Sequence, residues 1–202
     1  MAHVLPALTD VMIKTERLIM RPLVAADALA YARAASDARI GAVMDHIPTA
    51  CPADLVRGWS ADVPGQIAAG TDYHLVITDK MDGSFVGSAN LGGMVELGVS
   101  GRQYEISYWM DPAHWGKGLA TECAIGLRDW AFDTLKAGGL RAACAMSNAA
   151  SARVLEKAGF HFINTTRYQP SGGEHARLRN AYRMDKPRWE TLVTRQTLSK
   201  AS

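Results

Sequence analysis

The sequence is poor in cysteine, has no strong excess of charge of either sign and contains no long apolar run. Its three cysteines, Cys51, Cys123 and Cys144, are far apart and form no C-x-x-C pair, so we expect reduced thiols rather than a disulfide framework or a zinc site. The net charge is +2, with acidic and basic residues mixed along the chain. Such a mixture lacks the basic stripe that a nucleic-acid surface requires.

Apolar stretches long enough for a membrane span are also missing. The first ten residues lack a basic segment and are interrupted by Pro6, and no later run has the length needed to cross a bilayer. We therefore expect a cytoplasmic protein that has neither a membrane nor a nucleic acid as a partner. The 202 residues are 48% hydrophobic and 21% charged, which suits one buried core and a single domain over 1–202.

Strand-like and helix-like segments alternate along the chain. Helices are expected at 24–36, from about Leu119 to Lys136, and from Ala149 to Ala158. Strands are expected at 15–23, 72–79, 85–96, 102–110, 140–146, 160–168 and 175–184. Between residues 40 and 70, the prolines at 48, 52 and 64 predict short helical or irregular pieces, where a specificity loop could lie. This order of elements predicts a mixed sheet with helices packed on it.

The long helix that is expected to begin at Leu119 is amphipathic. Apolar residues recur every four positions along it, at Leu119, Cys123, Leu127, Ala131 and Leu135, so one face should be buried against the sheet. A helix held in this way presents unpaired N–H groups and the positive end of its dipole at 116–120. We therefore expect an anion there, with Gly116 and Gly118 allowing close approach and Lys117 adding charge.

Three phosphate sites can be compared with the stretch HWGKGLATECA at 114–124. A dinucleotide fingerprint needs a third glycine where this chain has Thr121, and a P-loop needs a lysine directly after its second glycine, which Gly118 does not have. The third possibility is the pyrophosphate of coenzyme A. Read from Trp115, the positions of Gly118 and Ala120 resemble the [RQ]-x-x-G-x-[GA] signature of the GNAT superfamily of N-acetyltransferases. Trp115 stands where many members have Arg or Gln.

Further segments resemble the RimJ/RimL-like branch of that superfamily, in the family's order. They are TERLIMRPL, YEISYWMDP, DPAHWGKGLATEC, NAASARVLEKAGF and AYRMDKPRW, and together they span about 13–190. The resemblance implies an α/β GNAT fold, with a strongly curved, mixed, mostly antiparallel sheet of about six or seven strands. This sheet would be splayed after the fourth strand, with acetyl-CoA as co-substrate in the splay and no metal.

The resemblance also implies which residues bind the coenzyme. They lie on the fourth strand, in the glycine loop and in the Asn-x-x-Ser segment, namely Ser107, Tyr108, Trp109, Met110, Trp115, Gly116, Lys117, Gly118, Leu119, Ala120, Thr121, Asn148, Ser151 and Arg153. Asn148 also suits the N-cap of the helix that follows, and a serine at position 151 is unremarkable in a first helical turn. Both residues therefore have a structural explanation beside the functional one.

Acetyl transfer to an amine needs a base, an oxyanion donor and an acid for the leaving thiol. Ser151 is the candidate acid, and a backbone N–H around Ser107–Trp109 is the expected oxyanion donor. Glu105 is the first candidate base, although an exposed structural glutamate is equally typical of an alternating strand, and Glu174 is the second. An α-amine with a pKa near ~8 is about a tenth neutral at pH 7, so a weak base or water suffices.

The favoured acceptor is the N-terminal α-amine of a protein or peptide. The same chemistry on a small amine, such as an antibiotic, a polyamine or an amino acid, is one alternative. A coenzyme-binding module without catalysis is another, although the presence of both Asn148 and Ser151 favours an enzyme. Either a monomer or a homodimer is compatible with the sequence.

Overall fold

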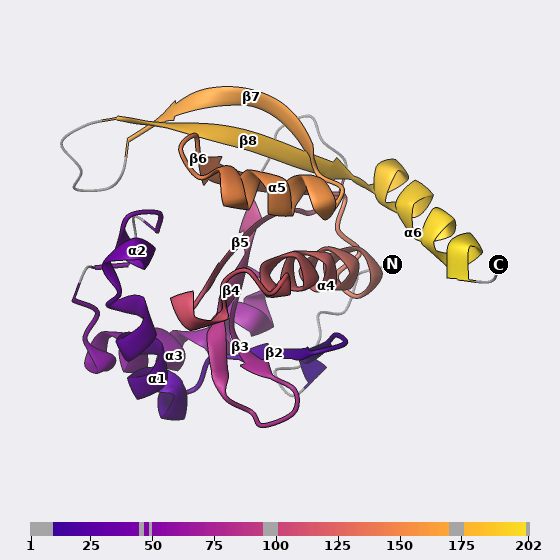
Figure 1. Ribbon diagram of the computed structural model, residues 1–202. Coiled ribbons are helices and arrows are strands. Elements are labelled where there is room, and N and C mark those ends of the chain that lie inside the picture. The colour runs from indigo at the N-terminus through magenta and orange to yellow at the C-terminus, as the bar shows by residue number, and fades with distance from the viewer. Residues whose placement is uncertain (1–9, 45–46, 49, 95–100, 170–175, 201–202) are drawn as a thin grey trace.

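The computed structural model describes residues 10–44, 47–48, 50–94, 101–169 and 176–200 (Figure 1). The described part of the chain forms one sheet of eight strands in the order β1-β2-β3-β4-β5-β6-β8-β7. The strands are β1 (Ile13–Lys14), β2 (Leu18–Pro22), β3 (Asp72–Asp79), β4 (Phe85–Met94), β5 (Gln103–Met110), β6 (Gly139–Ala145), β7 (His161–Tyr168) and β8 (Arg177–Asp185). Neighbouring strands are antiparallel except for β5 and β6, which are parallel. The mixed, mostly antiparallel and open sheet is confirmed, with one or two more strands than expected.

Helices cover both faces of this sheet (Figure 1). They are α1 (Ala28–Ala35), α2 (Ala38–Gly41), α3 (Ala53–Ala69), α4 (Leu119–Asp133), α5 (Ala149–Lys157) and α6 (Lys186–Lys200), with single 3-10 turns η2 (Ala25–Asp27) and η3 (Pro112–His114). Successive residues of a strand point to opposite faces. His74 contacts Tyr31 of α1, whereas the adjacent Tyr73 contacts Trp130 of α4. The helices α1 and α3 therefore lie on one face and α4 on the other.

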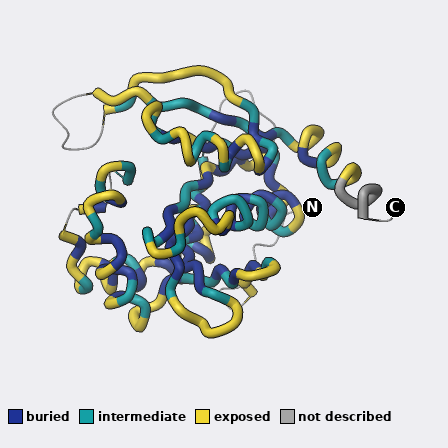
Figure 2. The backbone as a smooth tube through the Cα atoms, viewed as in Figure 1, coloured by how far each residue is buried: buried dark blue, intermediate teal, exposed yellow. Residues whose placement is uncertain are grey.

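The core lies between α4 and the central strands, where Figure 2 shows the buried part of the chain. Leu75, Leu91 and Tyr104 from the sheet and Cys123 and Leu127 from α4 have no exposed surface. By contrast, β7 at the edge of the sheet is exposed over most of its length. None of the described helices is long and apolar enough to span a bilayer.

The expectation of short or irregular pieces between residues 40 and 70 is wrong for its second half. The helix α3 runs for 17 residues with Pro64 inside it. A proline at this position removes one backbone hydrogen bond and is normally unfavourable. However, Val56, Val63 and Ile67 are buried on one side of α3, and this burial outweighs the local cost. Tertiary packing thus decides the conformation here.

Three other boundaries differ from expectation. The strand expected at 15–23 begins only at Leu18, because residues 15–17 form the turn between β1 and β2. The helix that begins at Leu119 ends at Asp133 instead of Lys136, whose φ of 53° is left-handed. The closing segment continues beyond β8 into α6, which was not expected and which projects away from the sheet (Figure 1).

Candidate active site

The strands β5 and β6 separate after a short stretch of pairing. They are in parallel register only where Gln103–Glu105 faces Gly139–Arg141, while β6 continues along β8 as far as Ala145. A cavity of about 600 Å³ lies where they diverge, and Ile106–Met110 of β5 and Ala142–Ala145 of β6 line it. The strand that was expected to be the fourth is β5 of the structure. The numbering differs because the short strand β1 comes before the others. The expected splay is thus present at this strand.

The turn before α4 opens into the same cavity. Gly116 and Gly118 have φ angles of 75° and 76°, the left-handed region that favours glycine. A Cβ built on Gly116 would meet no described atom within 4 Å, and one on Gly118 would meet only Arg17 Nη2 at 3.7 Å. There is therefore free space beside both glycines, and both line the cavity. Together with the N-terminus of a 15-residue helix, this turn suits a pyrophosphate.

Arg17 and Glu122 hold this turn in place, and the sequence interpretation missed both. Glu122 Oε2 accepts from Arg17 Nε at 2.7 Å, and its Oε1 accepts from Thr15 Oγ1 at 2.6 Å and from the Arg17 N–H at 2.7 Å. Arg17 Nη1 also donates to the Lys117 carbonyl at 3.0 Å. The β1–β2 turn is thereby fastened to the first turn of α4 and to the glycine loop.

Glu122→Gln should destabilise the fold in a pH-dependent way. Burial alone would raise the pKa of Glu122, but hydrogen bonds from Thr15 and Arg17 hold that pKa below its usual value. A carboxylate whose pKa is lowered by folding stabilises the fold at pH values above its unfolded-state pKa. This stabilisation is lost as the pH falls through the folded-state pKa. Because Arg17 is half exposed, we expect a loss of about 1 kcal/mol at pH 7. Urea unfolding at pH 7 and near pH 4 measures this loss of stability. An equal loss at the two pH values would show that it does not come from the lowered pKa of Glu122.

Most of the residues that were expected to bind the coenzyme line this cavity. They are Ser107, Tyr108, Trp109, Met110, Trp115, Gly116, Gly118, Leu119, Ala120, Thr121, Asn148, Ser151 and Arg153. Lys117 is exposed and outside the lining, and it contributes its carbonyl to the anchor at Arg17. Arg39 in α2 and Met44 just after α2 also line the cavity, although neither residue stands out in the sequence. Arg39, which is ion-paired with Asp37, lies 5.3 Å from the centre of the Trp115 ring.

Asn148 and Ser151 belong to one local motif at the start of α5. The Asn148 side chain accepts from the Ser151 N–H at 3.0 Å, which makes Asn148 the N-cap of α5 as expected. The Ser151 hydroxyl lies close to Tyr108, whose buried Oη makes no hydrogen bond to a described residue. Burial raises the pKa of Tyr108 well above its usual value, and Ser151 opposes that shift. Both hydroxyls are therefore protonated at neutral pH and lie in the lining of the cavity.

The structure describes only one of the two candidate bases, Glu105 and Glu174. Glu105 is exposed on β5 and lines neither of the two cavities described here. It faces Gly92 across β4, and Gly92 faces Asp72 of β3, so Glu105 shares a face of the sheet with Asp72. Glu174 lies outside the described residues.

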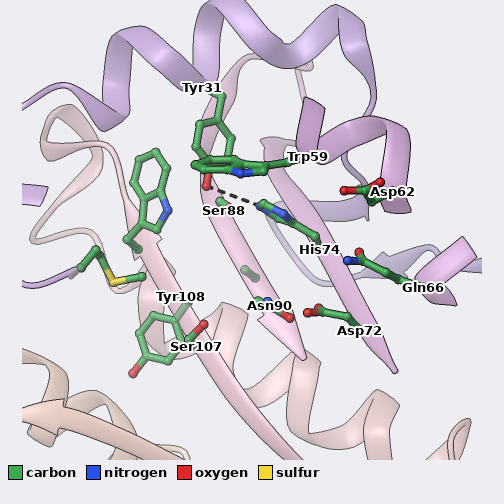
Figure 3. Close-up of a pocket in the computed structure, with 13 residues that line it drawn as sticks. Tyr31, Trp59, Asp62, Gln66, Asp72, His74, Ser88, Asn90, Ser107 and Tyr108 are labelled. Carbon is green, nitrogen blue, oxygen red and sulfur yellow. Dashed lines mark hydrogen bonds between the residues drawn. The ribbon is translucent and has the colours of Figure 1, made fainter. Parts of the chain in front are cut away.

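A second cavity, of about 230 Å³, adjoins the first on the face covered by α1 and α3 (Figure 3). The two cavities share Met44 and the segment Ser107–Trp109. The second is lined further by Tyr31, Trp59, Asp62, Gln66, Asp72, His74, Ser88, Ala89 and Asn90. Sequence analysis did not single these residues out. The alternation in DYHLVITD places Asp72 and His74 on one face of β3, but only the packing of α3 shows that this face bounds a cavity.

Comparison with known proteins decides the family. The model of the acetyltransferase (GNAT) domain matches residues 17–161. This chain belongs to the GNAT acetyltransferases. The cavity between β5 and β6 has an open turn and a helix N-terminus, an arrangement that suits a pyrophosphate.

Two curated relatives come from Bacillus subtilis. The probable N-acetyltransferase YjcK is 37% identical over 90 residues, which is 45% of this chain and 49% of that protein. The uncharacterized protein YkkB is 34% identical over 93 residues, or 46% of this chain and 52% of that protein. This acetyltransferase therefore spans about half the length of the curated relatives that it matches.

Solved structures share the fold over most of the chain. Mycobacterium smegmatis RimJ in complex with CoA-disulfide has a TM-score of 0.76 at 19% identity, covering 87% of this chain and 88% of that one. RimL, a ribosomal L7/L12 alpha-N-protein acetyltransferase in complex with coenzyme A, has a TM-score of 0.73 at 14% identity, covering 86% and 97%. At these identities the two neighbours show that this chain shares their fold.

Proposed function

We propose that this acetyltransferase transfers the acetyl group of acetyl-CoA to a primary amine, and that the favoured acceptor is the N-terminal α-amine of a protein or peptide. The observation that carries the proposal is the pair of adjoining cavities that share Ser107–Trp109. One cavity reaches the glycine turn, and the other reaches the surface beside α3. A thioester beside β5 would therefore meet an acceptor that enters from the other side.

The named activities of the structural neighbours favour an α-amine. RimL is an alpha-N-protein acetyltransferase, and another neighbour from Vibrio fischeri is a ribosomal-protein-S5-alanine acetyltransferase. Both are less than 25% identical to this chain, so they support the choice of acceptor only by analogy of fold. A small amine is the alternative, because the second cavity is smaller than the roughly 300–1,000 Å³ typical of sites for drug-sized ligands.

In the proposed reaction the amine nitrogen attacks the thioester carbonyl carbon. The new C–N bond forms, the C–S bond breaks, the amine loses one proton and the thiolate gains one. Backbone N–H groups of β5 at Ser107–Trp109 would stabilise the oxyanion, because β6 has diverged from this part of β5. Tyr108 and Ser151 are the two hydroxyls from which the thiolate could take its proton. The amine proton goes to water or to a base.

Glu105→Gln tests Glu105 as a base that acts through water. Since Glu105 is exposed and lines neither cavity, we expect kcat/KM for the amine to fall by about tenfold, below the ~10²-fold typical of a base in direct contact. Raising the pH should partly restore the rate, because more of the α-amine is then already neutral. The exposed Glu190→Gln on α6 is the matched control. A Glu105→Gln enzyme with the wild-type rate and pH profile would exclude Glu105 and leave Glu174 or water.

The experiment that tests the proposed function is an acetylation assay. It follows thiol release from acetyl-CoA in the presence of N-terminal peptides or small amines, with mass spectrometry of the acceptor. Thiol release that depends on a peptide α-amine supports the proposal. Release with small amines alone would replace the favoured acceptor with the alternative.

A further inference from the structure

The cavity beside α3 has an acidic floor and mouth. Asp72 lies at the floor and is partly exposed, and Asp62 of α3 is exposed at the mouth (Figure 3). Among the described residues that line this cavity there is no lysine or arginine. The side-chain oxygens Asp72 Oδ1 and Asn90 Oδ1 are buried and have no hydrogen-bond partner among the described residues. Buried acceptors without donors are costly. A ligand that brings a donor group could therefore satisfy these two oxygens.

Aromatic rings form another wall of this cavity. Tyr31 and Trp59 meet edge to face with ring centres 5.9 Å apart, and Tyr31 lies 5.2 Å from Trp109 of β5. His74 lies 6.0 Å from Trp59, and its Nε2 is 3.4 Å from Tyr31 Oη. Such a wall suits the alkyl part of an amine, and aromatic faces attract cations.

Sheet register sets the distance between the acidic floor and the expected position of the thioester. Ser107 of β5 faces Asn90 of β4, which faces His74 of β3, so these three residues form one row across the sheet. Asp72 lies in the next row, two strands from β5. Two strand spacings amount to about 10 Å. An amine bound at Asp72 is thus too far from β5 to attack, since reacting atoms must come within about 3.5 Å.

We propose that the acceptor carries a second positive charge, which Asp72 binds with Asp62 at the mouth, while the reactive amine lies in the Ser107–Asn90–His74 row. This inference rests on the proposed transfer to a primary amine and names the class of acceptor. Burial raises the pKa of Asp72, the neighbouring Asn90 amide opposes that shift, and a bound cation would offset that burial. The shared chemistry is a primary amine separated from a second cation by a short alkyl segment. Either a free diamine or a peptide with a basic residue next to its N-terminus supplies it.

The test compares acceptors that differ only in the second charge. The free pair is diaminobutane and butylamine, and the peptide pair carries lysine or norleucine at its second position. We expect the charged member of one pair to have a kcat/KM at least about tenfold higher. Asp72→Asn should abolish that preference, while Asp133→Asn at the far end of α4 removes an equal charge and should leave it unchanged. The pair that discriminates identifies the source of the acceptor.

Two results would overturn the inference: neither pair discriminates, or the preference persists in Asp72→Asn. If Asp72→Asn does not fold, as judged by circular dichroism, the exposed Asp62→Asn should still reduce the preference, and an unchanged preference there counts against the inference. Calorimetric binding of diaminobutane to the CoA-saturated protein separates the two proposals. Binding that Asp72→Asn weakens at least about tenfold, without any turnover, would retain the inference and reject the proposed function. Turnover without a preference for the charged acceptor would retain the proposed function and reject the inference.

Discussion

Gly118→Val should abolish tight binding of acetyl-CoA. Gly118 caps α4 with a φ of 76°, and it lines the cavity between β5 and β6. A branched side chain there would disfavour this conformation and occupy space that the described protein atoms leave free. We expect the affinity for acetyl-CoA, measured by isothermal titration, to fall by at least about 100-fold.

A second glycine supplies the matched control for backbone strain. Gly83, in the turn between β3 and β4, has a φ of 73°, and a Cβ built on it would meet no described atom within 4 Å. Gly83→Val therefore carries similar strain, about 1–2 kcal/mol or more for a branched residue in this conformation. Both variants should lose similar thermal stability without ligand, and only Gly118→Val should lose acetyl-CoA affinity. If Gly118→Val and Gly83→Val bind acetyl-CoA with equal affinity, Gly118 is only a turn residue.

Removing the proton donor for the leaving thiol should have the second large effect. Ser151 and Tyr108 both line the coenzyme cavity with hydroxyls that are protonated at neutral pH. General acid catalysis is worth ~10²-fold or more. We expect Ser151→Ala to lower kcat by about 100-fold with a much smaller rise in the KM for acetyl-CoA, because the proton is transferred only in the transition state.

Tyr108→Phe distinguishes a direct donor from a supporting one. If Ser151 donates directly, Tyr108→Phe should lower kcat less than Ser151→Ala, and the double variant should resemble Ser151→Ala. If Tyr108 is the donor, the order of the two single variants reverses. Full activity of Ser151→Ala would return Ser151 to its role in the first turn of α5. Some turnover through water should remain in each variant, since a thiol with a pKa near ~8.5 is a tolerable leaving group.

Local sequence patterns predicted several elements around the cavity between β5 and β6. The spacing of apolar residues placed α4, and the two glycines before it marked the turn that leads into its N-terminus. Asn148 was identified as an N-cap because that role depends on neighbours within three residues. These features are local in the chain, so pattern and resemblance were enough.

Contacts between distant segments could not be read in the same way. The anchor between Arg17 and Glu122 joins residues 105 positions apart, and neither residue stands out in its own segment. The cavity beside α3 depends on a helix that Pro64 seemed to forbid. Asp72 and His74 line a cavity only because α3 covers their face of β3. The alternation along 102–110 left open whether Glu105 faces the cleft or the solvent, because its exposure depends on what packs around it.

The acetyl-transfer assay with purified protein tests the central claim most directly. Acetyl-CoA is supplied with a peptide that has a free N-terminus, and its N-terminally blocked counterpart is the control, while thiol release and the mass of the peptide are followed together. We expect thiol release in equal amount to an acetyl group gained on the free α-amine, and none with the blocked peptide. Calorimetric binding of acetyl-CoA without acetylation of any peptide or small amine would contradict the proposal, and the chain would then be a coenzyme-binding module without catalysis.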